Sequence, residues 1–315
     1  MSFLNDAGVW ARASVCGSSG GRRFGGSRYA DRLPIGTLPV LEGFKHETLK
    51  EYYNAWYRPE LMAVCAVGDF DVDKVEALIK EKFANLTNNP NAPKRQSFDV
   101  PDHKGLRVAI ASDAEAAQTT IQLNYKHPLS IATTQEDLRK GMVAELFNSM
   151  LGTRLDELIQ KGGTPFTYAF SFYSNYVRTK NGFQSFAMVN EKGILEGLRL
   201  LLIENQRVKL HGFNAGEFER AKKDMMVGME KAYKERDKTE SNRYVMGLVN
   251  AYLENEPFSD VAFRFEFYKK YLAGITLAEV NTLGKNGLPK RAIMPVVSFK
   301  PRVKTPSNCQ PNLKL

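Results

Sequence analysis

The unit "EYYNAWYRPELMAVCAVGDFDVDKVEALIKEKF" (residues 51–83) sets the class of fold, because it reads as helix, turn, strand, turn and helix with almost nothing left over. Pro59 ends the first helix, since proline disfavours helical backbone in the residue before it. Apolar side chains recur at spacings of three and four on one face of that helix. They are Leu49, Tyr52, Tyr53, Trp56 and Tyr57.

The run "LMAVCAVG" has the length of a strand and the continuous hydrophobicity typical of the middle of a buried sheet. Cys65 lies within it and is expected to be an inert core residue. Asp71 can cap the next helix. That helix is expected to bury Val72, Val75, Leu78, Ile79 and Phe83. Nothing in this unit has the pattern of a reactive centre, so a strand held between two helices is its expected role.

Beyond a proline-rich linker the pattern changes to paired strands followed by grouped helices. "LRVAIAS" and "TTIQLNY" alternate apolar and polar residues, as half-buried strands do. A long helix is predicted from Thr133, which forms a capping box with Glu136, and Gly152 is expected to interrupt it. "FTYAFSFYSNYV" and "GFQSFAMVN" predict a hairpin with Asn181-Gly182 as its turn.

The last third of the chain is mostly helical. Helices are predicted at about 193–209, 215–236, 240–254 and 276–286, the last with a capping box of Thr276 and Glu279. "VAFRFEFYKKYL" is compatible with a strand or a helix, and "RAIMPVVSF" predicts a final strand that Pro295 makes an edge or irregular strand. Without strict strand–helix alternation, the order favours α+β, with a mostly antiparallel sheet covered by helices.

Composition limits the classes of function. The net charge of +9 comes from basic residues spread along the chain, with only "FKPRVK" locally dense, and no nucleic-acid-binding signature accompanies them, so nucleic acid is not an expected partner. No run approaches the roughly 20 apolar residues of a membrane span. The N-terminus lacks a signal-peptide pattern, and bacterial periplasm or cytoplasm is the expected compartment. The three cysteines, Cys16, Cys65 and Cys309, are too few and too distant for a disulfide framework.

No catalytic motif can be assigned from spacing. The four histidines, His46, His103, His127 and His211, are isolated, and neither H-E-x-x-H nor H-x-x-E-H occurs. A formal G-x-S-x-G around Ser19 lacks the strand and helix that a nucleophile elbow needs. The aromatic stretch "FTYAFSFYSNY" can serve a core face, hold a peptide or stack bases, and spacing does not choose among these.

Five pieces nonetheless resemble, in order and spacing, the pitrilysin or insulinase-type zinc peptidases. They are "SRYADRLPIGT", the unit with Tyr57, Pro59 and Val67-Gly68-Asp69, "LFNSMLGTRLDELI" with Leu151-Gly152 and Arg154-Leu155, "GFNAGEFERAKKDM" with Ala221-Lys222, and "ITLAEVNTL". The resemblance covers about residues 27–300. It implies a metallopeptidase-repeat fold like that of pitrilysin and mitochondrial processing peptidase, in which related repeats enclose a chamber for peptides.

The resemblance also implies a domain layout. Residues 1–26 are expected to be a disordered tail, 27–87 the end of a first α+β repeat, 88–104 a linker, 105–300 a complete second repeat and 301–315 a disordered tail. In the family, the first repeat carries H-x-x-E-H, where zinc activates a water and the glutamate takes its proton. Because this chain lacks that motif, catalytic and metal residues are not assigned, and zinc is expected only in a complete enzyme.

In relatives, a later repeat can supply an arginine and a tyrosine that face the substrate. The positions here that match are Tyr168, with Lys161 where arginine would stand, and Arg154 of the Arg-Leu pair is a further candidate. The leading hypothesis is therefore a non-catalytic region of a zinc metalloendopeptidase, whose partner is a motif-bearing repeat or subunit and whose ligand is a peptide. A structural subunit like the core proteins of respiratory complexes, or a basic binding module, are the alternatives.

Overall fold

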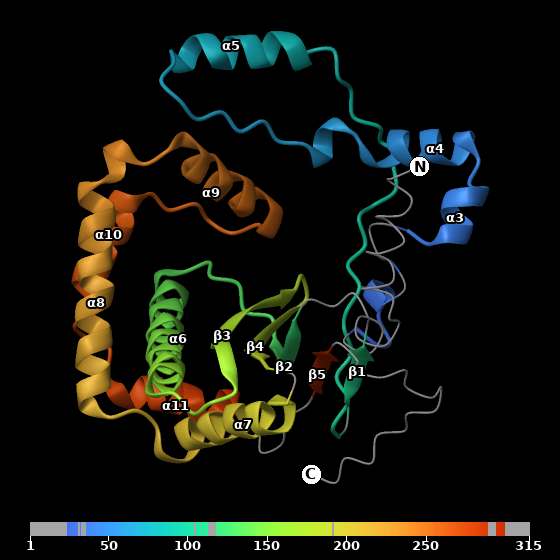
Figure 1. The fold of residues 1–315 in the computed structure, drawn as a ribbon. Coiled ribbons are helices and arrows are strands. Elements are labelled where there is room, and N and C mark those ends of the chain that lie inside the picture. The colour runs from blue at the N-terminus through green and yellow to red at the C-terminus, as the bar shows by residue number, and fades with distance from the viewer. Residues whose placement is uncertain are drawn as a thin grey trace.

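The computed structural model describes residues 24–30, 32, 36–103, 105–112, 118–190, 192–288 and 294–299. The predictions for residues 1–23 and 300–315 lie outside these ranges. Two parts can be distinguished, an N-terminal unit (residues 36–86) and a main body (residues 109–299) (Figure 1). After η1 (Arg28–Ala30), the N-terminal unit comprises α3 (Leu38–Gly43), α4 (His46–Trp56), η2 (Pro59–Leu61) and α5 (Val72–Phe83).

The main body is built on one five-stranded sheet with the order β1-β5-β2-β4-β3. Every pairing is antiparallel except β1 with β5. This confirms the predicted α+β class. Its elements are β1 (Ala109–Ser112), β2 (Thr119–Pro128), α6 (Gln135–Lys161), β3 (Phe166–Val177), β4 (Lys180–Val189), α7 (Ile194–His211), α8 (Ala215–Lys234), η3 (Arg236–Lys238), α9 (Ser241–Glu254), α10 (Val261–Tyr271), α11 (Leu277–Gly287) and β5 (Met294–Phe299).

The core lies between one face of the sheet and the helices α6, α7 and α11 (Figure 1). Phe147 of α6 is fully buried at its centre. The Phe147 ring meets those of Tyr173, Phe183 and Phe213 edge-on, with ring centroids 5.2, 6.1 and 5.4 Å away. The closeness of α11 to the sheet depends on Gly287, because a Cβ there would overlap the Tyr173 hydroxyl.

A short chain of polar side chains is buried in this apolar core. The Ser171 hydroxyl donates to the Ser185 hydroxyl across β3 and β4 at 2.8 Å, and the Asn205 amide of α7 donates to the same Ser185 oxygen at 3.0 Å. Tyr125 also bonds to Asn205, but burial is the larger influence and raises the pKa of Tyr125 to about 12. Because buried polar atoms need partners, this network fixes α7 in one position on the sheet.

The helices lie where the sequence patterns predict them, but two details of α6 differ from the prediction. The capping box of α6 is Thr134 with Asp137, one residue after the predicted Thr133 and Glu136. Gly152 does not interrupt α6, which continues to Lys161 because its apolar stripe remains buried on both sides of the glycine. The ambiguous segment at 261–272 is mostly helix α10, and the capping box of Thr276 and Glu279 is confirmed.

Two strand predictions were wrong. Asn181 and Gly182 lie within β4, and the hairpin turn is at residues 178–179. Gly182 instead allows close packing, since a Cβ there would come within 3.2 Å of both the Tyr125 carbonyl and the Tyr176 Cβ. The final strand β5, predicted to be an edge or irregular strand, lies inside the sheet between β1 and β2, so the edge alternative was wrong. Its Pro295 is tolerated because pairing with β1 begins only at Val296, so Pro295 has a strand on one side alone.

The N-terminal unit departs most from expectation. Residues 62–67 are extended but pair with no strand among the described residues, although their sequence predicted a buried strand. Cys65 is half-buried, and neither α4 nor α5 contains a buried residue. Asp71 caps α5 as predicted, by accepting from the Lys74 amide at 3.1 Å. The local structure thus follows the sequence, whereas the expected burial does not occur within the described part of this chain.

Replacing Phe147 with alanine should destabilise the protein by roughly 3–5 kcal/mol, because the truncation opens a cavity where three rings meet. Urea unfolding of the full chain would measure the loss. Phe263→Ala is the matched control, since that ring is 44% exposed and its removal should change the free energy of unfolding by about 0.5 kcal/mol or less. Equal losses for the two variants would contradict the assignment of the core.

A second prediction concerns the stability of the fold at low pH. The Glu279 carboxylate of α11 accepts from the Arg139 guanidinium of α6 at 2.6 Å. This hydrogen bond is the main cause that lowers the pKa of Glu279 from 4.5 to about 2. Because the pKa is lowered in the folded state, the stabilisation is complete above about pH 4.5 and is lost as the pH falls toward 2.

Glu279→Gln should therefore lower stability at pH 7 by on the order of 1 kcal/mol, a value discounted for the partial exposure of the pair. The difference from the unmodified chain should shrink at pH 3, as measured by thermal unfolding at both pH values. Glu76→Gln, which removes an exposed pair with Lys80 on α5, serves as the control. If the difference in stability between Glu279→Gln and the unmodified chain is the same at both pH values, Arg139 and Glu279 do not act as a pair.

Candidate functional site

The histidines of this chain do not form a metal centre. His46 begins α4, His127 lies near the end of β2 and His211 ends α7. His103 lies before β1, outside the helices and strands, so the four are on separate parts of the fold. Across the part of the chain that the structure describes, no three histidine, cysteine, aspartate or glutamate side chains lie close enough to hold a metal ion. These residues therefore do not fit a catalytic zinc. No helix in the described ranges is both long and apolar enough to cross a membrane.

Two of the predicted substrate residues share one cavity, which we call the charged pocket. It has a volume of about 580 Å³ and lies between the end of α6, the end of α7 and the start of α8. Arg154 and Lys161 line it together with Glu157, Glu204 and Arg207. Two of the residues predicted from the sequence, both on α6, therefore line the same pocket. Their contact with a substrate stays a prediction.

Arg154 is held by the protein itself. Its Nε and Nη2 donate to the two oxygens of Glu217 at 2.5 and 2.9 Å, and Nη2 also donates to the Gly212 carbonyl at 3.0 Å. The guanidinium lies 4.7 Å from the centre of the Phe213 ring. Burial alone would raise the pKa of Glu217, but the bonds from Arg154 and Asn214 outweigh it and lower that pKa. Arg154 therefore ties α6 to the start of α8.

The charged pocket also contains an unsatisfied acceptor. Glu204 is 3% exposed, and its Oε1 accepts from Arg207 at 2.8 Å. Its Oε2 is buried and has no hydrogen-bond partner among the described residues. A buried carboxylate oxygen without a donor is unfavourable, so a water molecule or a ligand donor is expected beside it.

Tyr168 lies elsewhere, on the edge strand β3 and on the sheet face opposite α6. The strand register groups Tyr168 with Met188 and Thr120, and next to them Phe170 with Phe186 and Gln122. Tyr168 is 51% exposed. The rings of Phe170 and Phe186 stack with centroids 5.1 Å apart. The structure therefore separates Tyr168 from Arg154 and Lys161 and sets it in an aromatic row beside an open sheet edge.

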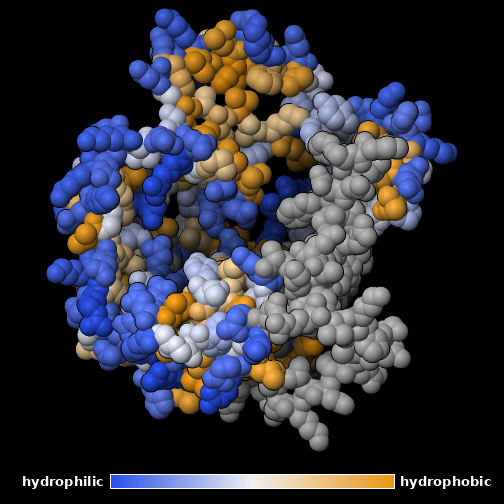
Figure 2. All heavy atoms as spheres, viewed as in Figure 1, coloured by the Kyte–Doolittle hydropathy of each residue, from blue (hydrophilic) through white to orange (hydrophobic). Residues whose placement is uncertain are grey.

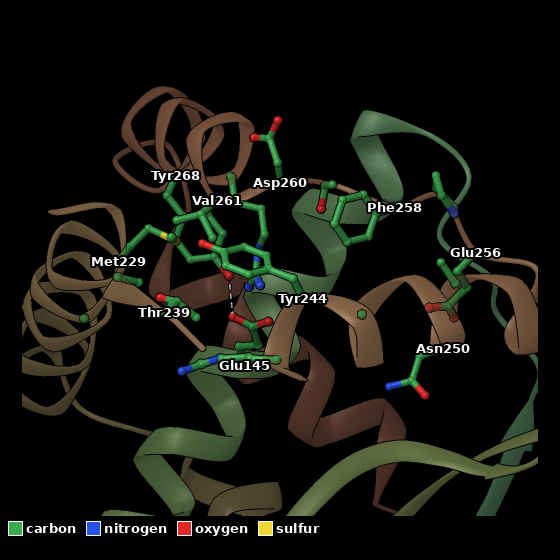
Figure 3. A pocket seen from close by; sticks show the side chains of 18 of the residues that line it. Glu145, Met229, Thr239, Tyr244, Asn250, Glu256, Phe258, Asp260, Val261 and Tyr268 are labelled. Atoms are coloured by element: carbon green, nitrogen blue, oxygen red, sulfur yellow. Dashed lines mark hydrogen bonds between the residues drawn. The ribbon is translucent and has the colours of Figure 1, made fainter. Parts of the chain in front are cut away.

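A further cavity, which we call the helical pocket, lies between α6, α8, α9 and α10 and has a volume of about 530 Å³ (Figure 3). Glu145, Tyr244, Phe258 and Tyr268 line it. Glu145 and Tyr268 are 123 positions apart in the chain, and the Tyr268 hydroxyl donates to Glu145 at 2.6 Å. Sequence reasoning missed this site because residues from four helices form it and no local motif marks any of them.

Comparison with known proteins relates this chain to one family of peptidases. Residues 43–225 match the family described as the peptidase M16 inactive domain. "Zinc protease PQQL-like" of Arabidopsis thaliana is 30% identical over 257 residues, which cover 81% of this chain and 24% of that protein. "Probable zinc protease PqqL" of Escherichia coli is 26% identical over 80% of this chain and 27% of that protein.

The fold has solved counterparts as well. The crystal structure of the periplasmic protease PqqL from Escherichia coli superposes with a TM-score of 0.81 and 19% identity, over 94% of this chain and 34% of that chain. At this identity the likeness concerns the fold alone. The present chain spans about a quarter of the length of the two curated relatives that it matches.

Arg154→Lys should destabilise the chain by about 1–3 kcal/mol, because lysine cannot reproduce the two-pronged bond to Glu217 and leaves a partly buried carboxylate short of donors. Chemical denaturation would measure the loss. The matched control is Lys161→Ala in the same pocket, where the side chain is exposed and the free energy of unfolding should change by about 0.5 kcal/mol or less. If Arg154→Lys is neutral, the clamp between α6 and α8 is not a stabilising contact.

Proposed function

This chain belongs to the M16 peptidase family, which it matches through the family's inactive domain, and we propose that it acts as the non-catalytic part of a peptide-enclosing chamber. Cleavage would need a second repeat or subunit that supplies the zinc ligands and the general base. The isolated histidines support this, because they offer no ligand set of their own within the described residues.

The observation that carries the proposal is the uncovered apolar surface of the N-terminal unit. Leu49 and Tyr53 of α4, Val64 of the extended segment and Val72 of α5 are 57, 57, 53 and 68% exposed. Figure 2 shows apolar residues gathered on this unit. Apolar surface exposed to water is unfavourable by about 25 cal/mol per Å², so a surface of this kind indicates a partner.

The shape of that surface suggests what covers it. The extended segment 62–67 offers backbone groups that no described strand pairs with, and the helices α4 and α5 precede and follow it in the chain. A partner that adds β-strands to this segment and packs apolar side chains on the two helices would complete an α+β repeat. A motif-bearing first repeat is such a partner, and its zinc would then lie in the same chamber wall as this unit.

The edge strand β3 is the proposed contact for the peptide. It is the last strand of the sheet, and its outer edge has no strand beside it in the described ranges. A peptide in extended conformation can add to such an edge through main-chain hydrogen bonds, while side chains contact the neighbouring sheet face. The half-exposed rings of Tyr168, Phe170 and Phe172 stand on that face and favour apolar peptide side chains.

Co-expression with an H-x-x-E-H-bearing repeat from a full-length relative tests the proposal. We expect the two chains to copurify and to cleave an unfolded protein only together, in a zinc-dependent manner. Val64→Asp should abolish copurification, because it puts a charge in the middle of the covered surface.

Leu195→Asp is the matched control, since Leu195 of α7 is also exposed but lies outside the N-terminal unit, and copurification should persist. Peptide cleavage by this chain alone would overturn the proposal. A stable complex without any peptidase activity would instead favour a structural subunit.

A further inference from the structure

The helical pocket has a chemistry that the proposed function does not use. It lies between four helices of the main body, and its lining includes no residue of the N-terminal unit or of the edge strand β3 among those described (Figure 3). Its volume of about 530 Å³ lies in the range of sites that hold small ligands or single side chains. The α9 helix, which contains no buried residue, forms one wall through residues such as Tyr244 and Asn250.

The floor of the pocket is a fixed carboxylate. Glu145 projects from α6, and its Oε2 accepts from the Tyr268 hydroxyl of α10 (Figure 3). Tyr268 is 7% exposed, and its hydroxyl proton is directed to Glu145. Glu145 itself is exposed, and its second oxygen has no partner among the described residues. The carboxylate is thus held in place with one acceptor free toward the cavity.

The lining mixes polar groups with apolar and aromatic side chains. Met225 and Met229 come from α8, Tyr244 comes from α9 and Phe258 from the loop before α10. Figure 3 shows Tyr244 beside Glu145, with Met229 and Tyr268 on the neighbouring helices. A side chain with an apolar stem can contact the methionine and aromatic side chains while its tip meets the carboxylate. This is the arrangement that suits lysine and arginine, whose stems are buried while their heads keep a charged partner.

The charge of the pocket has the matching sign. Four acids line it, Glu145, Glu235, Glu256 and Asp260, against the two arginines Arg243 and Arg264. The local balance is therefore two negative charges, in a chain whose net charge is +9. Both arginines carry a positive charge that opposes a cationic ligand, and the Arg264 guanidinium lies 5.9 Å from the centre of the Tyr268 ring. An anionic ligand would be repelled by the Glu145 carboxylate.

We propose that the helical pocket binds the side chain of an arginine or lysine residue of a peptide, with Glu145 taking the charged head and Met225, Met229 and Tyr244 surrounding the stem. The inference rests on the proposed function for the identity of the ligand as a peptide. It adds a preference for basic residues in the peptides that the chamber retains. The Glu145 carboxylate would accept charge-assisted hydrogen bonds, which are stronger than neutral ones.

Calorimetric titration of the full chain with N-acetyl-argininamide tests the proposal. The matched ligand is N-acetyl-citrullinamide, which has the same shape and length without the charge. We expect the arginine compound to bind at least about fivefold more tightly. Equal affinity of the two compounds, or no binding of either at millimolar concentration, would overturn the proposal.

Variants then locate the binding. Glu145→Gln keeps the bond from Tyr268 but removes the charge, and it should weaken arginine binding about fivefold or more while leaving citrulline binding unchanged. Arg243→Glu should strengthen arginine binding. Glu196→Gln is the control, because Glu196 is an exposed acid on α7 outside the pocket. If Glu145→Gln and Glu196→Gln behave alike, the ligand does not occupy this cavity.

These measurements use the chain without a zinc-bearing partner, so they do not depend on assembly. Glu145→Gln should still copurify with that partner, because the pocket is separate from the N-terminal unit. If the unmodified chain assembles with its partner but does not bind the arginine compound, the result counts against the pocket alone. If it binds the arginine compound but does not assemble, the result counts against the proposed function alone.

Discussion

The burial of α6 against one face of the sheet is the contact on which the main body depends. Phe147 of this helix joins the rings of β3 and β4 to Phe213 after α7. Each end of α6 carries an arginine that reaches another helix, Arg139 to α11 and Arg154 to α8. The remaining helices are therefore positioned relative to α6, and both pockets include residues of this helix.

The sheet divides the main body into a closed side and an open side. On the closed side, helices seal the apolar face and its buried serine–asparagine network. On the open side, the row of aromatic rings on β3 and β4 remains half-exposed next to the edge strand. A protein that only needed stability would gain by covering such rings. Their exposure is consistent with a surface that contacts extended peptides.

Local signals in the sequence were sufficient for much of the fold. Capping residues such as Asp71 and Thr276 act over one helical turn, so their positions follow directly from the sequence. Pro295 and Gly182 were misjudged because their roles depend on which strands lie beside them, and this is not visible in a local pattern. The helical pocket was invisible for the same reason, since Glu145 and Tyr268 meet only after the helices have packed.

The extended segment 62–67 limits the concentration at which this chain can stay in solution. An extended apolar segment whose backbone groups pair with no described strand is a template for indiscriminate pairing, including with other copies of itself. Chains in which this segment stays uncovered would therefore be prone to aggregate, and this tendency would rise with their concentration.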